Sequence, residues 1–119
     1  MVNLLLVNLL WSFINEKGLT LFTRIDHSSN AQNAGLELNP TELFILGNPK
    51  VGTPLMQCSM TAAIDLPQKI LVYQDDSDRT QVVYNQPAYL KTRHNIKDCD
   101  EILTKIDNVL TAITKAATE

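Results

Sequence analysis

The chain has 119 residues, which is the usual size of one domain, so residues 1–119 are taken as a single domain. Apolar residues make up 45% of the chain and charged residues 19%, a balance typical of globular proteins that excludes a disordered chain. Ten basic residues stand against thirteen acidic ones, which gives a net charge of -3, and the basic residues form no cluster. Nucleic acid and membrane surfaces are therefore not expected as partners.

The leucine-rich start of the chain, as far as Trp11, could be mistaken for a signal peptide. It has neither the basic segment nor the small-residue cleavage site of such peptides, and it is too short to span a bilayer. We interpret residues 3–17 as an amphipathic helix that ends at Gly18, and we infer a cytoplasmic protein. The apolar face of this helix is wide, so we expect it to be covered by a sheet or by a second subunit.

Three further elements are expected in the first half of the chain. Residues 19–25 have the alternation of a strand. A short helix over residues 30–34 would be capped by Asp26 or Ser28 and ended by Gly35. Residues 42–46 are apolar without alternation, which is typical of a central strand.

The second half of the chain predicts a hairpin and two helices. Residues 69–73 and 80–84 flank a polar turn and are expected to pair. Residues 86–91 predict a short helix, and apolar residues spaced by three and four predict a long one over residues 97–117. This order indicates an α+β fold, a two-layer sandwich with an antiparallel or mixed sheet and helices packed on one face.

The stretch Phe44–Met56 joins the central strand to a helix through a loop expected over residues 47–53. Thr53 is a good N-cap, and Pro54 would suit the first helical position. Two interpretations stay open. The helix start, with Lys50 and Gly52, could bind an anion, although the spacing is not that of a P-loop. Alternatively, the glycines form a tight turn, Asn48 bonds its own backbone, and Thr53 only caps.

The two histidines and two cysteines are the other candidates for chemistry. Asp26-His27 and Arg93-His94 could form a general base or metal site if the fold brought them together, but we favour capping and turn roles. We expect Cys58 to be a buried structural residue rather than a nucleophile. A disulfide with Cys99 is possible, but we favour two free thiols.

No metal or cofactor is predicted. The acidic run at residues 75–78 does not match the spacing of a calcium loop, so we interpret it as a solvated hairpin turn. Tyrosines and methionines in the strands and helices are interpreted as core rather than as the lining of a pocket. A nucleophile, base and orienting group cannot be recognised in the sequence, so an enzyme is the least favoured class.

Several motifs recur in order along the chain, including Lys17-Gly-Leu-Thr-Leu-Phe-Thr-Arg-Ile-Asp-His27, Gly47-Asn-Pro-Lys-Val-Gly-Thr-Pro-Leu-Met56, Ile64-Asp-Leu-Pro67, Lys69-Ile-Leu-Val-Tyr73, Tyr84-Asn-Gln-Pro-Ala-Tyr-Leu90 and Arg93-His94. In these motifs the chain resembles the domain of unknown function 302 family, over roughly residues 10–95. The resemblance implies a TATA-binding-protein-like fold and a homodimer, and it implies little chemistry. Members of the family usually begin with a strand, whereas this chain begins directly in a helix.

Two functional hypotheses follow. In the first, the chain is a binding module for a small anionic or partly apolar ligand, held near the strand–helix junction and bordered by His27. The expected ligand-binding residues are His27, Asn48, Lys50, Gly52 and Thr53. In the second, the apolar first helix mediates assembly and the chain has no ligand.

Overall fold

The computed structural model describes residues 4–118, without the side chains of residues 4–6 and 117. Its sheet is an antiparallel meander of four strands in the order β1-β2-β3-β4. The strands are β1 (Thr20–Asp26), β2 (Thr41–Gly47), β3 (Gln68–Gln74) and β4 (Thr80–Tyr84). The predicted α+β fold and the central position of residues 42–46 are confirmed.

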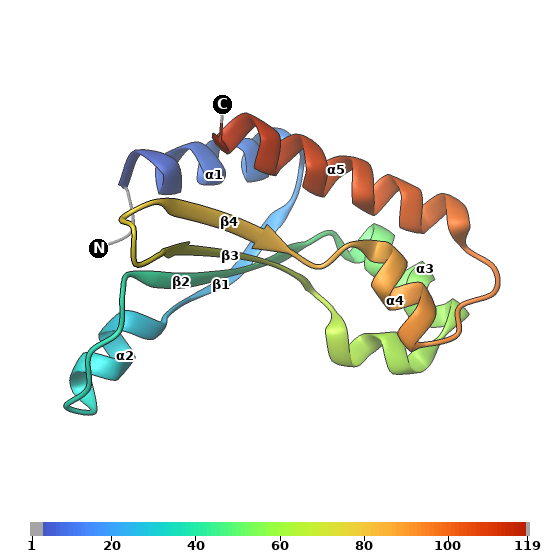
Figure 1. Ribbon diagram of the computed structural model, residues 1–119. Coiled ribbons are helices and arrows are strands. Elements are labelled where there is room, and N and C mark those ends of the chain that lie inside the picture. The colour runs from blue at the N-terminus through green and yellow to red at the C-terminus, as the bar shows by residue number, and fades with distance from the viewer. Residues whose placement is uncertain (1–3, 119) are drawn as a thin grey trace.

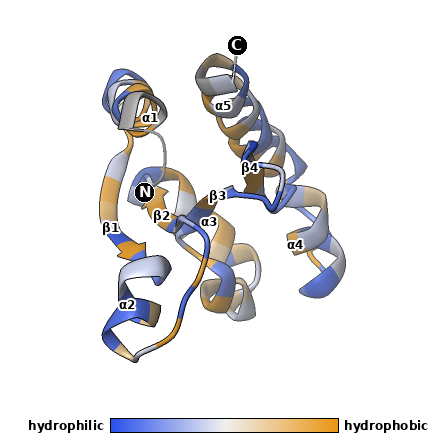
Figure 2. Ribbon diagram, turned by 60° about the vertical axis from the view of Figure 1, so that its left-hand side comes forward, coloured by the Kyte–Doolittle hydropathy of each residue, from blue (hydrophilic) through white to orange (hydrophobic). Residues whose placement is uncertain are grey.

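Two long helices, α1 (Leu4–Glu16) and α5 (Asp100–Thr118), lie together on one side of the sheet (Figure 1). Both helices were predicted, although α5 begins three residues later than expected and residue 3 lies outside the described part of the chain. Gly18, just beyond α1, has the positive φ of 70° that favours glycine at a helix end. Hydrophobic and hydrophilic residues alternate along α5, so one side of this helix is apolar (Figure 2).

Shorter helices occupy the ends of the sheet (Figure 1). The helix α2 (His27–Asn33) lies at one end and begins three residues earlier than predicted. The helix α3 (Pro49–Cys58), the 3₁₀ helix η1 (Met60–Asp65) and the helix α4 (Pro87–Arg93) lie toward the other.

The core lies between the sheet and the pair α1 and α5. Side chains alternate between the two faces of a strand, and in β2 and β3 the buried ones, such as Phe44, Leu46, Ile70 and Val72, are those that point to these helices. At the edge of the sheet, Arg24 stacks over the Phe44 ring at 5.0 Å and pairs with Glu42 at 2.9 Å. The buried apolar residues include Val7, Leu10, Ile14, Phe44, Leu46, Leu55, Ile70, Val72, Leu90, Leu103, Ile106, Leu110 and Ile113.

The opposite face of the sheet is apolar and only partly covered. Leu43, Ile45 and Leu71 alternate with the buried residues and are half-buried, and Val83 is 44% exposed. Leu71 and Val83 are paired across β3 and β4, so these side chains are neighbours. The long helices cover one face of the sheet, as the two-layer prediction states. The second face is also apolar and is partly open to solvent.

Candidate functional site

The junction between β2 and α3 is organised by Asn48. Its side-chain Oδ1 accepts a hydrogen bond from the Lys50 N–H at 3.0 Å, and its carbonyl accepts from the N–H groups of Val51 and Gly52, both at 2.8 Å. Pro49 takes the first helical position, where a missing N–H has no cost. Asn48 is therefore the N-cap, and the chain turns directly from strand into helix.

The predicted loop over residues 47–53 is wrong, because α3 begins at Pro49 rather than after Thr53. Asn48-Pro49 has the same cap-then-proline chemistry as Thr53-Pro54, and it comes first along the chain. Pro54 lies inside the helix, where the only backbone bond it removes is the one to the carbonyl four residues earlier. One such loss is tolerated because Leu55, the next residue, is fully buried in the core.

A cavity of about 260 Å³ lies beside this junction, between the start of α3, the strand β1 and the helix α5. Its wall is mostly apolar. Such cavities, with a few polar groups in the wall, are the usual form of small-molecule sites. The apolar lining includes Phe22, Val51, Met56, Leu66, Ile106 and Val109.

Three of the five predicted ligand-binding residues line the cavity: Asn48, Gly52 and Thr53. Gly52 leaves open space, because a Cβ built there would have no atom within 4 Å. Lys50 belongs to the same helix but does not line the cavity, and His27 begins α2 at the other end of the sheet (Figure 1).

Gln68 is the residue of this cavity that sequence reasoning missed. It is only 8% exposed, and its Nε2 has no hydrogen-bond partner within residues 4–118. It shares the helix-facing side of β3 with the buried Ile70 and Val72, and it lines the cavity. The alternation 68, 70, 72 was visible in the sequence and could have placed a polar side chain among core positions.

Positive charge reaches the cavity from Lys17 and Lys105, which both line it and are both exposed. No ion pair of either side chain is found in the part of the chain that the structure describes. The backbone donors of the first turn of α3 are less accessible to a ligand, since Asn48 already accepts from Lys50, Val51 and Gly52. An anion at this cavity would therefore meet two lysines rather than free N–H groups.

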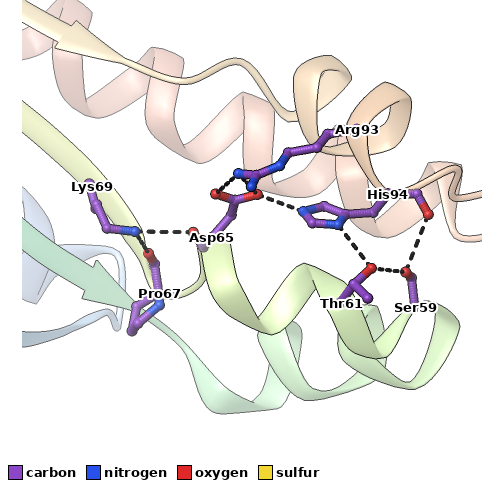
Figure 3. Close-up of polar contacts among 7 residues, drawn as sticks. All are labelled: Ser59, Thr61, Asp65, Pro67, Lys69, Arg93 and His94. Atoms are coloured by element: carbon purple, nitrogen blue, oxygen red, sulfur yellow. Dashed lines mark hydrogen bonds and ion pairs between the residues drawn. The ribbon is translucent and has the colours of Figure 1, made fainter.

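A second polar group, formed by residues outside the cavity wall, surrounds His94 (Figure 3). The His94 Nε2 lies 2.6 Å from Asp65 Oδ2, and its Nδ1 lies 2.9 Å from Thr61 Oγ1. Arg93 donates to both carboxylate oxygens of Asp65, at 2.8 and 3.0 Å. Ser59 donates to the His94 carbonyl at 3.3 Å, and its Oγ lies 3.2 Å from Thr61 Oγ1.

Asp65 is held in its ionised form by these contacts. The hydrogen bond from His94 lowers the pKa of its carboxyl group, and the positive charges of Arg93 and Lys69 lower it further. Burial acts in the opposite direction but does not reverse the shift. The Lys69 Nζ also donates to the carbonyls of Asp65 and Pro67, at 3.3 and 3.2 Å, and so fixes the segment that leads into β3.

The two histidines do not meet, because α2 and α4 lie at opposite ends of the sheet (Figure 1). The favoured capping role of Asp26 is confirmed: its Oδ1 accepts from the Ser29 N–H at 3.0 Å and from the Ser28 hydroxyl at 2.6 Å. These hydrogen bonds lower the pKa of Asp26 to about 2. His94 instead pairs with Asp65, a carboxylate 29 residues away in the sequence.

The expectation of two free thiols is wrong, since Cys58 and Cys99 form a disulfide. Their Cα atoms are 6.7 Å apart, and the bridge joins the end of α3 to the residue before α5. The pairing could not be deduced from a separation of 41 residues. It forms only because α4 and the loop after it place the start of α5 beside the end of α3. Across residues 4–118, no three histidine, cysteine or acidic side chains gather as metal ligands.

The comparison with known proteins assigns the family. The family described as "Domain of unknown function DUF302" matches residues 6–113. The chain belongs to this family. The fold agrees, because the crystal structure of an uncharacterised conserved DUF302 protein from Bacillus stearothermophilus superposes with a TM-score of 0.85. That likeness covers 94% of this chain and 88% of the other, at 20% sequence identity.

Two curated relatives are named as fluoride-specific ion channels. The protein FluC 1 of Brucella suis and the protein FluC 2 of Brucella melitensis are each 43% identical to this chain over 88 residues. The matched segment is 74% of this DUF302 chain but only 35% and 33% of those relatives. The chain thus spans about a third of the length of the curated relatives it matches. Between Leu4 and Thr118, no helix is long and apolar enough to cross a membrane.

Proposed function

We propose that this DUF302 chain is a binding module for a small apolar molecule that carries an anionic group. The observation that carries the proposal is the Gln68 amide, which has a buried Nε2 without a partner in the wall of an apolar cavity. A buried donor left unpaired costs about 1–3 kcal/mol. A ligand that accepts a hydrogen bond from this amide would remove that cost.

The chemistry of the wall defines the ligand class. The apolar body of the molecule contacts side chains such as Phe22 and Ile106, and its anionic group lies near Lys17 and Lys105. Among the residues predicted from the sequence, this proposed site keeps Asn48, Gly52 and Thr53. It does not include His27 or Lys50, which lie outside the cavity wall.

Octanoate tests the proposal in a titration of isotope-labelled protein followed by NMR. We expect saturable shifts of the Gln68 side-chain amide and of the Gly52 N–H. Octanol, which has the same chain without the charge, should bind more weakly. Lys105→Met removes one exposed charge contact of about 1 kcal/mol and should raise Kd about fivefold.

A matched control for this titration is Lys97→Met, because Lys97 is an exposed lysine outside the cavity wall. Its Kd for octanoate should equal that of the unmodified protein. Absence of a saturable shift at millimolar octanoate would contradict the proposal. The proposal would also be contradicted if octanoate shifted the signals of all other wall residues equally in Gln68→Met and in the unmodified protein.

The second candidate function is assembly into a homodimer. It is favoured by the partly open apolar face of the sheet, where Leu43, Ile45, Leu71 and Val83 lie, because large exposed apolar surfaces mark interfaces. The first helix was the predicted assembly surface, and there Trp11 is 51% exposed. Light scattering at micromolar concentration tests both surfaces. Val83→Lys should give a monomer if the dimer forms through the sheet face. Trp11→Lys should give a monomer if the dimer forms through the first helix. A monomer without either change would exclude assembly.

The cytoplasmic location inferred from the sequence stays a prediction. The Cys58–Cys99 disulfide argues against it, because such bonds are usual in oxidising compartments and rare in the cytosol.

A further inference from the structure

The group around His94 contains the three parts of an activated hydroxyl nucleophile. Thr61 supplies the hydroxyl, the His94 ring lies 2.9 Å from it, and Asp65 holds the other ring nitrogen at 2.6 Å. Nucleophile, base and orienting carboxylate in hydrogen-bond contact are the geometric signature of acyl-transfer sites on unrelated folds. These three residues are separate from the cavity proposed above, because none of them lines it.

The proton positions follow from the acceptors present. The ionised Asp65 carboxylate can only accept, so the His94 Nε2 facing it must carry a hydrogen. In the neutral ring the Nδ1 is then the basic nitrogen, and it faces the Thr61 hydroxyl. In that tautomer the Thr61 hydroxyl donates to Nδ1, which is the arrangement required for removal of its proton; its 3.2 Å contact with the Ser59 Oγ then holds no hydrogen, because Ser59 donates to the His94 carbonyl. Arg93 occupies the same carboxylate and keeps it ionised and oriented.

The base is rigid and the nucleophile is accessible. The His94 side chain is only 5% exposed, and Ser59 fixes its backbone through the carbonyl. Thr61, in contrast, is exposed at the start of η1. A 3₁₀ helix has three residues per turn, so Ile64 lies on the same side as Thr61 and is 71% exposed. An apolar acyl group bound at Thr61 would contact Ile64.

We propose that Thr61 is a nucleophile that hydrolyses carboxylic esters with a small apolar acyl group. The Thr61 oxygen attacks the ester carbonyl carbon while the His94 Nδ1 takes the hydroxyl proton. The ester C–O bond then breaks, and the alcohol leaves with that proton, so Thr61 carries the acyl group. Water attacks the new ester, gives a proton to Nδ1, and releases the carboxylic acid as Thr61 recovers its hydrogen. Asp65 is a positioning residue, since it acts through His94.

The test uses p-nitrophenyl acetate and the whole chain. Brief incubation should place one acetyl group on the peptide that contains Thr61, measured by mass spectrometry, with release of p-nitrophenol. Thr61→Val should abolish both signals, and Thr61→Ser should restore them. His94→Gln removes the general base, whose contribution is typically about 100-fold or more in rate. The fold of each variant is checked by circular dichroism.

Two further variants make the result decisive. Thr92→Val is the matched control, because the Thr92 hydroxyl bonds the Ala88 carbonyl within α4 and lies outside the group. It should label and turn over like the unmodified protein. Asp65→Asn should slow acylation and move the pH profile of the rate to lower pH, because the protonated ring loses its carboxylate partner; a loss of folded protein alone would lower the rate equally at every pH. Acetylation that is absent from Thr61, or turnover that survives in Thr61→Val, overturns the proposal.

Discussion

Replacing Gln68 by methionine should make the protein more stable. The amide Nε2 of Gln68 is buried without a partner among the described residues, and leaving such a donor unpaired costs about 1–3 kcal/mol. Methionine has a similar length and no donor, so it keeps the packing against the neighbouring core and removes that cost. We expect a gain of about 1 kcal/mol in the free energy of unfolding. At an unfolding entropy of about 2.1 cal/mol/K per residue, this gain raises Tm by about 4 °C for a chain of this length.

The change in Tm and the urea midpoint both measure this gain, and the matched control is Gln81→Met. Gln81 lies on β4, and its Nε2 donates to Asp75 Oδ2 at 3.1 Å, so the same substitution there breaks a hydrogen bond. Gln81→Met should leave Tm unchanged or lower it. The reasoning would be refuted if Gln68→Met lowered Tm as well, because the Gln68 amide would then have a partner in the folded state. The same variant should bind octanoate more weakly, so stability and binding are expected to change in opposite directions.

Three other changes test the fold. Reduction of the Cys58–Cys99 bridge frees a loop of about 40 residues. The chain-entropy relation predicts that this lowers the free energy of unfolding by about 4 kcal/mol, so the urea midpoint should be lower with a reductant than without it. The pKa of Asp26 is about 2 in the folded protein, against an ordinary value of 3.8, so its contribution is complete above pH about 4 and is lost as the pH falls toward 2. Asp26→Asn should flatten the acid-unfolding profile in that range, and an unchanged profile would contradict the capping role. Leu55→Ala should lower the free energy of unfolding by about 2–5 kcal/mol, because Leu55 is fully buried; a loss below about 1 kcal/mol in urea would mean that the start of α3 is not anchored to the core.

Most of the fold was predictable because its signals are local. The hairpin of β3 and β4 has strand alternation on either side of a polar turn, and the end of α1 has a glycine where positive φ is needed. The start of α3 was not predicted, because two cap-and-proline pairs follow one another and local chemistry cannot rank them. The burial of Leu55, which depends on the tertiary structure, favours the first pair, and the N–H groups of Val51 and Gly52 then bond the Asn48 carbonyl.

The candidate sites were less predictable than the fold. Asn48, Gly52 and Thr53 could be chosen from one stretch of sequence, and the cavity brings these three together. One lysine of the cavity directly follows α1 and the other belongs to α5, so only the packing of those helices places them beside α3. The partner of His94 was missed for the same reason, because Asp65 lies 29 residues away in the sequence and reaches the ring only when η1 and α4 are packed together.

The two proposed sites share one short segment, and its geometry makes them separable by experiment. Asp65 belongs to the group around His94, whereas Leu66, Pro67 and Gln68, the next three residues, line the cavity. The Lys69 side chain donates to the carbonyls of Asp65 and Pro67 and so fixes the backbone between the two sites (Figure 3). The carboxylate of Asp65 and the amide of Gln68 have no bond in common, because the first is satisfied by His94 and Arg93 and the second has no partner among the described residues. A substitution of the Gln68 side chain therefore leaves the contacts of His94 intact, and a substitution of Thr61 leaves the cavity wall intact, so failure of one proposal would not imply failure of the other.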